Sequence, residues 1–177
     1  MKTIITLQFT VYCLLFTMGY GQDTVFVPQD YPTIQQGIDA AVDGNVVLVD
    51  TGTYLENISY NGKAITLTSK FIYSHDEFYR ENTIIDGSNP AIPNNGSAVI
   101  FGTDEDTTSV LYGFTITGGS GTYNPGNQYI MGGGILFNYA GGKVVHNVIK
   151  ENNLYSDDPL GSGVYGGGIG VLFLYSG

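Results

Sequence analysis

YPTIQQGIDAAVDGNVVLVDTGTYLENI, residues 31–58, is the stretch of sequence that indicates the fold. Its first half carries apolar residues at helical spacing: Ile34, Ile38 and Ala41. Thr33 and Gln36 form a capping box in front of these residues, and Gly44 is a stop signal behind them. The pattern predicts a short helix over about residues 34–42.

The second half of this stretch contains an unbroken apolar run, Val46 to Val49, between Asn45 and the turn sequence Asp50-Thr51-Gly52. Such a run predicts a buried strand that ends at the turn. A helix of about ten residues is too short to be stable by itself. We therefore expect the helix to pack on the strands that follow it.

The composition favours a single domain of many short strands. The chain has 177 residues, enough for one sizeable core. Charged residues are only 12% of it, while glycine contributes 26 residues and tyrosine 14, a mixture typical of strands joined by tight turns. The 16 acidic residues against 6 basic ones repel phosphate, so the charge argues against a nucleic-acid partner or an anionic membrane surface.

Residues 1–21 have the anatomy of a secretory signal peptide. Lys2 precedes a mostly apolar run from Ile4 to Met18, which is short for a membrane span, and the small residue Gly19 follows it. Removal of this segment leaves a domain of residues 22–177 without cysteine, with 5 basic and 16 acidic residues and a net charge near −11. We therefore expect a secreted or cell-surface protein without disulfides and without a membrane span in the mature chain.

Further short strands are predicted where apolar runs end at turn signals. They cover residues 24–27, 63–69, 83–85, 98–101 and 109–117. Phe71 to Glu81 shows no clear period, and we interpret it as a loop that protrudes from the fold. Asp104 to Asp106 is interpreted as a solvated acidic turn.

The second half of the chain repeats itself. The sequence GGGI at residues 132–135 returns at residues 166–169. Ile116 has a counterpart in Ile149, at nearly the same separation along the chain. Two landmarks with nearly the same period predict a solenoid, in which each repeat packs its apolar face on the next. Because the repeats contain strands and turns, we expect stacked coils with parallel strands ~4.8 Å apart.

These motifs resemble those of the right-handed parallel β-helix proteins of the pectin-lyase-like superfamily, in particular bacterial secreted β-helix repeat proteins. The matching sequences are YPTIQQGIDAAVDG (31–44), VVLVDTGTYLENI (46–58), TIIDG (83–87), LYGFTITGG (111–119), GGGI (132–135) and NVIKENN (147–153). The first two are similar to the N-terminal coils of pectin methylesterase-like proteins. The resemblance implies an all-β fold, a right-handed parallel β-helix (solenoid) with a short N-terminal capping α-helix.

Gly52, Tyr54 and Glu56 match the GxYxE element in the first coils of similar pectin methylesterases. The resemblance implies a structural role for them, because the catalytic groups of those enzymes lie later in the chain. The glycines of the two GGGI motifs are expected to allow backbone bends that a Cβ would obstruct. No helix start follows these glycines, so they do not indicate a phosphate-binding loop.

Three asparagines fit the turn positions of a β-helix: Asn147, Asn152 and Asn153. Asparagine tolerates left-handed backbone geometry and can bond to stacked asparagines. We interpret His146 as a solvent-facing or hydrogen-bonded strand residue rather than a metal ligand. His75 lies beside Asp76 and Glu77, where a metal site is the alternative to ordinary solvation.

Calcium is the cofactor that similar polysaccharide lyases use, held by carboxylates of adjacent coils. The acidic candidates lie in predicted turns: Asp104, Glu105, Asp106, Asp157 and Asp158. The basic residues that could act as the base of a lyase are few: Lys63, Lys70, Arg80, Lys143 and Lys150. No cluster of aspartates indicates a hydrolase of the polygalacturonase type. We therefore assign no catalytic, cofactor-binding or metal-binding residue and no cofactor, and keep Ca²⁺ as the alternative.

The leading hypothesis is a secreted or cell-surface β-helix module that binds carbohydrate or serves as a structural scaffold, with a polysaccharide or cell-surface glycan as its partner. Tyrosines on a flat β-face could stack on neutral sugar rings. Two alternatives stay open: a polysaccharide lyase or carbohydrate esterase acting on pectin-like substrates, with its site on later coils or on Phe71 to Glu81, and an adhesin-like structural fibre. Because residues 170–177 stop within a predicted strand, we expect the chain to be truncated at its C-terminal end.

Overall fold

The computed structural model describes residues 23–126, 128–154 and 163–172. Within these ranges the chain forms four sheets and three short helices. Three of the sheets are entirely parallel, and the fourth is mixed. The predicted all-β character is therefore confirmed.

Each of the three parallel sheets collects strands that are widely separated along the chain. In spatial order, the first sheet contains β1 (Thr24–Val27), β2 (Val46–Val49), β5 (Thr66–Ser69), β9 (Val110–Tyr112) and β14 (Lys143–Val145). The second contains β15 (Val148–Ile149), β10 (Thr115–Thr117), β6 (Thr83–Asp86) and β3 (Gly52–Leu55). The third contains β17 (Ile169–Leu172), β13 (Ile135–Asn138), β8 (Val99–Phe101) and β4 (Ile58–Ser59).

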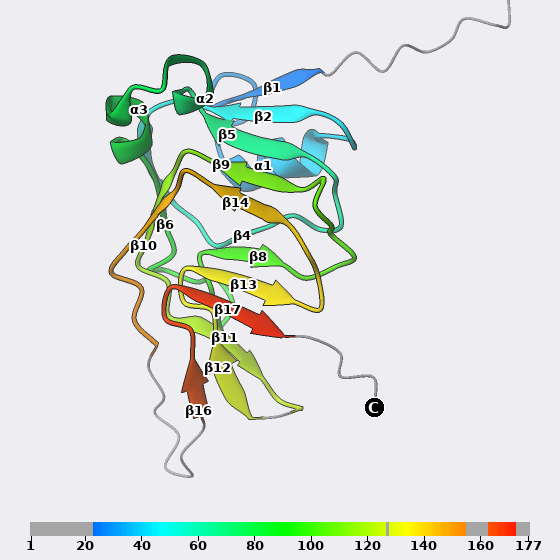
Figure 1. Ribbon diagram of the computed structural model, residues 1–177, viewed down its shortest axis with the longest axis vertical. Helices are drawn as coiled ribbons and strands as arrows, with labels where there is room; N and C mark the ends of the chain where they lie inside the picture. Colours follow the sequence, from blue (N-terminus) through cyan, green and yellow to red (C-terminus); the bar gives the residue numbers. More distant parts are fainter. Residues whose placement is uncertain (1–22, 127, 155–162, 173–177) are drawn as a thin grey trace, which may run out of the picture.

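The chain visits these three sheets in a fixed order. It passes from the first sheet to the second and then to the third, four times in succession: β2-β3-β4, β5-β6-β8, β9-β10-β13 and β14-β15-β17. Figure 1 shows the strands of the first and third sheets stacked one below another along the long axis of the molecule. This connectivity is compatible with the predicted β-solenoid, because every pass lays its strands on those of the pass before.

The sequence period corresponds to the register of the strands. Ile116 of β10 lies opposite Ile149 of β15, and Ile135 of β13 lies opposite Ile169 of β17. These are the residue pairs whose nearly equal spacings along the chain predicted stacked repeats. The inferred stacking is therefore confirmed at both landmarks.

The two GGGI motifs stack directly on each other. The amides of Gly133, Gly134 and Ile135 donate to the carbonyls of residues 166–168 at 3.2, 3.0 and 2.9 Å. Gly132 and Gly166, the first glycine of each motif, have φ values of 60° and 69°. Glycine adopts this left-handed region without the steric cost that a Cβ imposes, so the predicted backbone bends are confirmed at these two positions.

The fourth sheet branches from the stack near its C-terminal end. It contains β16 (Gly163–Tyr165), β12 (Tyr129–Met131), β11 (Gly121–Asn124) and β7 (Asn95–Gly96). Strands β11 and β12 form an antiparallel hairpin, whereas β12 and β16 are parallel. In Figure 1 this hairpin lies at the lower end of the molecule.

Helix α1 (Ile34–Ala40) packs on β1, β2 and β4 at the other end of the stack. The apolar residues at helical spacing are all buried: Ile34, Ile38 and Ala41. Thr33 is the N-cap, since its Oγ1 accepts the amide of Gln36 at 3.2 Å. The helix ends slightly earlier than predicted, because Ala41 is extended and the amide of Val42 donates to Asn45 Oδ1 at 3.0 Å.

Two charged side chains hold the ends of α1. The carboxylate of Glu56 accepts the amides of Ile34 and Gln35 at 2.9 and 3.0 Å. At the other end, Lys63 Nζ donates to the carbonyls of Ile38, Asp39 and Ala41 at 2.7, 2.5 and 2.8 Å. Both charges complement the helix dipole. The GxYxE element thus contributes a carboxylate that fixes the helix to the first pass of the chain.

The side chain of Gln35 extends the third sheet at its edge strand β4. Its Oε1 accepts the amide of Ser59 at 2.8 Å, and its Nε2 donates to the carbonyl of Ser59 at 3.1 Å. An amide side chain therefore supplies the pair of bonds that a neighbouring strand would supply. Through Gln35, helix α1 also covers part of the open edge of the first pass.

The core runs through the middle of the stack and includes a column of three aromatic rings. The ring of Phe101 lies between those of Tyr60 and Phe137, with centroid distances of 4.2 and 4.7 Å. Apolar residues from all four passes surround this column, among them Val47, Leu67 and Leu111 from the first sheet. The hydroxyl of Tyr60 donates to the carbonyl of Val110 at 2.8 Å, so this buried polar group has a partner.

The segment from Phe71 to Glu81 protrudes from the stack, as predicted, but it is not a loop. It forms two short helices, α2 (Phe71–Ser74) and α3 (Glu77–Glu81), and we call residues 71–81 the α2–α3 excursion. Figure 1 shows it projecting from one side of the stack. Helices of four and five residues are too short to display a helical period, which explains why the pattern suggested a loop.

The acidic turn at residues 104–106 is only partly solvated. Glu105 is buried, and its carboxylate accepts the amides of Gly62 and Thr103 at 2.9 and 2.6 Å. Asp104 and Asp106 are exposed, as predicted. The prediction was wrong for Glu105 because its partner Gly62 belongs to the preceding pass of the chain and is distant in sequence.

Two predictions fall on residues outside the described ranges. These are the signal peptide of residues 1–21, and Asp157 and Asp158 among the calcium candidates. Among the described residues, no helix is both long enough and apolar enough to cross a membrane.

Candidate functional site

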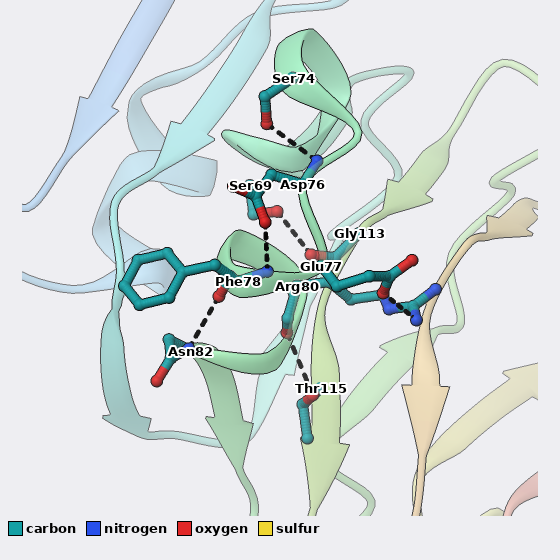
Figure 2. A network of polar contacts seen from close by, with 9 residues as sticks. All are labelled: Ser69, Ser74, Asp76, Glu77, Phe78, Arg80, Asn82, Gly113 and Thr115. Carbon is teal, nitrogen blue, oxygen red and sulfur yellow. Dashed lines mark hydrogen bonds and ion pairs between the residues drawn. The ribbon is translucent and has the colours of Figure 1, made fainter.

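The α2–α3 excursion is tied to the strands beneath it by side-chain hydrogen bonds. Ser69 Oγ donates to the carbonyl of Gly113 and accepts the amide of Phe71. Thr115 Oγ1 donates to the carbonyl of Arg80 at 3.1 Å, and Thr83 Oγ1 donates to that of Tyr79 at 2.6 Å. Figure 2 shows the contacts of Ser69 with Gly113 and of Thr115 with Arg80.

Helix α3 also carries side-chain caps at both ends. Asp76 is the N-cap of α3, and its Oδ1 accepts the amide of Phe78 at 3.0 Å. Asn82 Nδ2 donates to the carbonyl of Phe78 at 2.8 Å. His75, between the helices, has a left-handed backbone with φ 53°. These hydrogen bonds give the backbone of the excursion a defined conformation, and the backbone in turn determines where its side chains are attached.

The ring of Phe71 contacts both histidines and the only arginine in the sequence. Phe71 is buried, and its ring centroid lies 5.6 Å from that of His75 and 5.8 Å from that of His146. The guanidinium carbon of Arg80 lies 5.3 Å from the same centroid, within cation–π range. The ring of Tyr112 lies 5.9 Å from Phe71 and 5.2 Å from His146.

Ion pairs balance the basic groups at this site. Arg80 pairs with Glu77 on α3, and Lys70 Nζ lies 2.7 Å from a carboxylate oxygen of Asp50. The hydrogen bond from Lys70 lowers the pKa of Asp50 below its usual value. Arg80 Nε is buried and has no hydrogen-bond partner among the described residues. The cation–π contact with Phe71 therefore stabilises a guanidinium that is only partly hydrogen-bonded.

Two aromatic side chains of the excursion face solvent. Tyr73 on α2 is 69% exposed, and Phe78 on α3 is 56% exposed. Such exposure of large aromatic side chains loses the stabilisation that burial would provide. Figure 2 shows Phe78 pointing away from the network of polar contacts. The site thus combines exposed rings with a fixed backbone.

The structure places the sequence candidates as follows. His75 and His146 come together on Phe71, while Asp76 caps a helix and Glu77 pairs with Arg80. Among the described residues, no group of three or more histidine, cysteine, aspartate or glutamate side chains is placed to hold a metal ion.

The asparagine prediction was right about turns but wrong about geometry. In these two turns the residues with positive φ are His146 and Glu151, each directly before an asparagine, and not the asparagines themselves. Asn147 Oδ1 accepts the amide of Phe114 at 2.8 Å, and Asn152 Oδ1 accepts that of Gly119 at 2.9 Å. The side-chain amides therefore bond to the backbone of the preceding pass rather than to stacked asparagines.

Sequence reasoning missed Phe71 and Tyr112 as members of the site. A signal was present for Tyr112, because the separation of Ile116 and Ile149 also relates Tyr112 to Val145, the residue before His146. Tyr112 lies opposite Val145 in the register of β9 and β14, so His146 follows directly beside it. Phe71 carried no such signal, since the excursion interrupts the repeat at that point.

The chain was compared with protein-family models, with curated proteins and with solved structures, and none of the three comparisons finds a match.

Proposed function

We propose that this protein is a secreted or cell-surface module that binds carbohydrate through the α2–α3 excursion. The observation that carries the proposal is the pair of exposed rings, Tyr73 and Phe78, on a segment fixed by hydrogen bonds to β5, β6 and β10. Aromatic rings present a flat apolar face to the C–H face of a sugar. Because the segment is already ordered, little conformational entropy is lost on binding.

For the fold, the proposal is a right-handed parallel β-helix of the pectin-lyase-like type. Support comes from the fixed order in which the chain visits three parallel sheets. Crossovers between parallel strands are right-handed in about 98% of cases, because the strand twist favours that hand. The helix α1 at one end fits the capping helix implied by the sequence motifs, and residues 1–21 are the proposed export signal.

The charge of the protein favours a neutral glycan. The formal net charge is −10, so a polyanionic polysaccharide is repelled at long range. At the excursion itself, Arg80 and Lys70 already have carboxylate partners. A neutral polysaccharide needs no counter-charge and can bind through ring stacking and hydrogen bonds.

The test is retention on immobilised polysaccharides, followed by isothermal titration with the best ligand. Replacing Tyr73 and Phe78 together by alanine should weaken binding by roughly twofold to tenfold per ring, since one aromatic contact contributes about 0.5–1.5 kcal/mol. Tyr31→Ala, which removes an exposed ring beside α1, is the matched control and should bind normally. Retention of the parent on no polysaccharide, or equal binding by the double variant, would contradict the proposal.

A separate assay addresses the alternative enzyme class. The protein is incubated with pectic substrates while unsaturated products and released methanol are measured. The binding-module proposal expects neither product above the background of a heat-denatured sample. Turnover would replace it by a lyase or esterase assignment.

A further inference from the structure

A pocket of about 180 Å³ lies where the β11–β12 hairpin meets strand β13. Most of its lining comes from a single pass of the chain, and Leu172 of β17 belongs to the next pass. Tyr123 and Asn124 come from β11, Met131 from β12, and Leu136 and Asn138 from β13. The pocket shares no lining residue with the α2–α3 excursion. Its volume is below the ~300 Å³ of the smaller drug-sized pockets, so it suits a ligand of about one ring.

The lining combines buried apolar residues with two tyrosines. Met131 and Leu136 are buried, Tyr123 is half-buried, and Tyr139 is 49% exposed. None of the described residues that line the pocket is charged. An apolar surface with aromatic side chains and a few polar groups is typical of small-molecule sites, and the absence of charge in this lining favours a neutral ligand.

Asn138 lines the pocket, and the carbonyl oxygen of its side-chain amide is not hydrogen-bonded within the described residues. This oxygen, Oδ1, is buried. A buried polar atom without a partner is costly, so a ligand hydroxyl that donates to Oδ1, once the amide turns toward the pocket, recovers lost free energy. The terminal torsion of asparagine is broad and roughly two-fold, which allows either end of the amide to face a ligand.

Tyr139 adopts a backbone conformation that is unfavourable for a bulky residue. Its φ is 56°, in the left-handed region, and its amide donates to the carbonyl of Leu172 at 3.1 Å. Glycine or asparagine would occupy this position with less strain. A tyrosine here therefore points to a role for its ring rather than for its backbone.

From these observations we propose that the pocket binds one neutral sugar residue, with a C–H face on the ring of Tyr139 and a hydroxyl on the amide of Asn138. The sugar class of the ligand rests on the proposed carbohydrate-binding function. The pocket and the α2–α3 excursion consist of different residues, so variants of one site can be tested without changing the other. A neutral monosaccharide matches the pocket in size and charge. It has an apolar C–H face for the ring of Tyr139 and hydroxyl groups for the amide of Asn138.

The experiment is an NMR titration of the ¹⁵N-labelled full chain with glucose, galactose, mannose, xylose and N-acetylglucosamine. Galacturonate is the charged comparison. At least one neutral sugar should shift the amide resonances of residues 122–124 and 136–139, and galacturonate should shift them less. If none of the five neutral sugars shifts these resonances, or if galacturonate binds as well as the best of them, the inference is overturned.

Two variants separate binding from folding. Asn138→Leu and Tyr139→Asn should each weaken the sugar roughly tenfold, the factor expected for one lost polar or aromatic contact. Both should keep or raise the melting temperature, because one removes an unpaired amide oxygen and the other relieves backbone strain. Parent-like sugar affinity in both variants would refute the inference even if sugars bind elsewhere.

The Tyr73→Ala variant keeps the two proposals distinguishable. It should leave the monosaccharide titration unchanged while it weakens polysaccharide retention. If retention is unaffected but Asn138→Leu abolishes the monosaccharide shifts, the excursion proposal fails and the pocket inference stands. If the monosaccharide shifts also disappear in Tyr73→Ala, the assignment of the sugar to the pocket is wrong.

Discussion

Individual polar side chains form hydrogen bonds with backbone groups at the turns between strands. Asn147, Asn152 and Glu105 each bind backbone amides of another segment, and Asn57 Nδ2 donates to the carbonyls of Gly87 and Ser97, both at 3.0 Å. At turns the strand ladder is interrupted, so the buried backbone groups need other partners. Short amide and carboxylate side chains can meet this need without occupying much of the core.

Tyr60 allows a test at this scale, because its hydroxyl is the polar end of the internal aromatic column. Tyr60→Phe keeps the ring on Phe101 and removes the bond to the carbonyl of Val110. We expect a loss of about 1 kcal/mol in the free energy of unfolding near neutral pH, the typical net contribution of one hydrogen bond. Urea unfolding of parent and variant measures the difference.

The stability difference between the parent protein and Tyr60→Phe should depend on pH. Burial, with a smaller effect of the Glu105 charge, raises the pKa of Tyr60 well above its ordinary value. Its contribution to stability is therefore fully present below the unfolded pKa of about 10 and is lost as the pH rises from there through the folded pKa. The stability difference between parent and Tyr60→Phe should shrink above about pH 10. A difference that stays constant up to about pH 11 would contradict the burial of this hydroxyl.

Among the elements, helix α1 has the most specific attachment. Its apolar side rests on β1, β2 and β4, and its two ends are held by Glu56 and Lys63. Gly37, on the buried side, allows this close approach: a Cβ there would lie 2.8 Å from a methyl group of Val27. The helix therefore covers the open edge of the first pass, as expected for a cap that limits edge-to-edge association.

Replacing Ile38 by aspartate tests the role of this cap. Ile38 is fully buried, so a carboxylate there loses its hydration and the apolar contact, and we expect a loss of about 2–5 kcal/mol. Val42→Asp is the matched control, because Val42 lies just beyond the helix and is 61% exposed. Thermal unfolding followed by circular dichroism gives both midpoints. Equal midpoints for the two variants would show that α1 does not stabilise the stack.

At the scale of the whole molecule, the repeat positions are not equivalent, because inner passes have a neighbour on both sides. Gly134 and Gly168 occupy the same position of the two GGGI motifs. A Cβ on Gly134 would lie 2.7 Å from the carbonyl oxygen of Gly168 and 2.8 Å from Asn152 Nδ2. A Cβ on Gly168 would meet only a methyl group of Ile149 among the described residues, at an ordinary 3.7 Å.

We therefore expect Gly134→Ala to cost about 1–3 kcal/mol, the usual effect of overpacking, and Gly168→Ala to change stability by less than about 0.5 kcal/mol. Chemical unfolding of the two single variants measures this contrast. Neither glycine has a positive φ, so backbone strain does not enter the comparison. Similar losses for both variants would indicate that residue 168 is also packed against a neighbour.

The candidate site was accessible to sequence reasoning only in part. The contact of His146 with Tyr112 could be expected from the period, because His146 directly follows Val145, the residue that stacks on Tyr112. The contacts of His75 and Arg80 with Phe71 could not, because they depend on how the excursion folds between two strands. Nor could the unpaired amide oxygen of Asn138, since whether it finds a partner depends on the packing of the β11–β12 hairpin.

The short helix after Thr33, the strand at residues 46–49 and the stacking of the repeated motifs could be inferred from the residues alone, because capping, hydrophobic runs and periodicity are local or regular signals. Only the tertiary structure decided the burial of Glu105, the two helices of the excursion, the cluster on Phe71 and the pocket at Asn138. These features depend on contacts between residues distant in sequence, and such contacts exist only once the parallel sheets have formed.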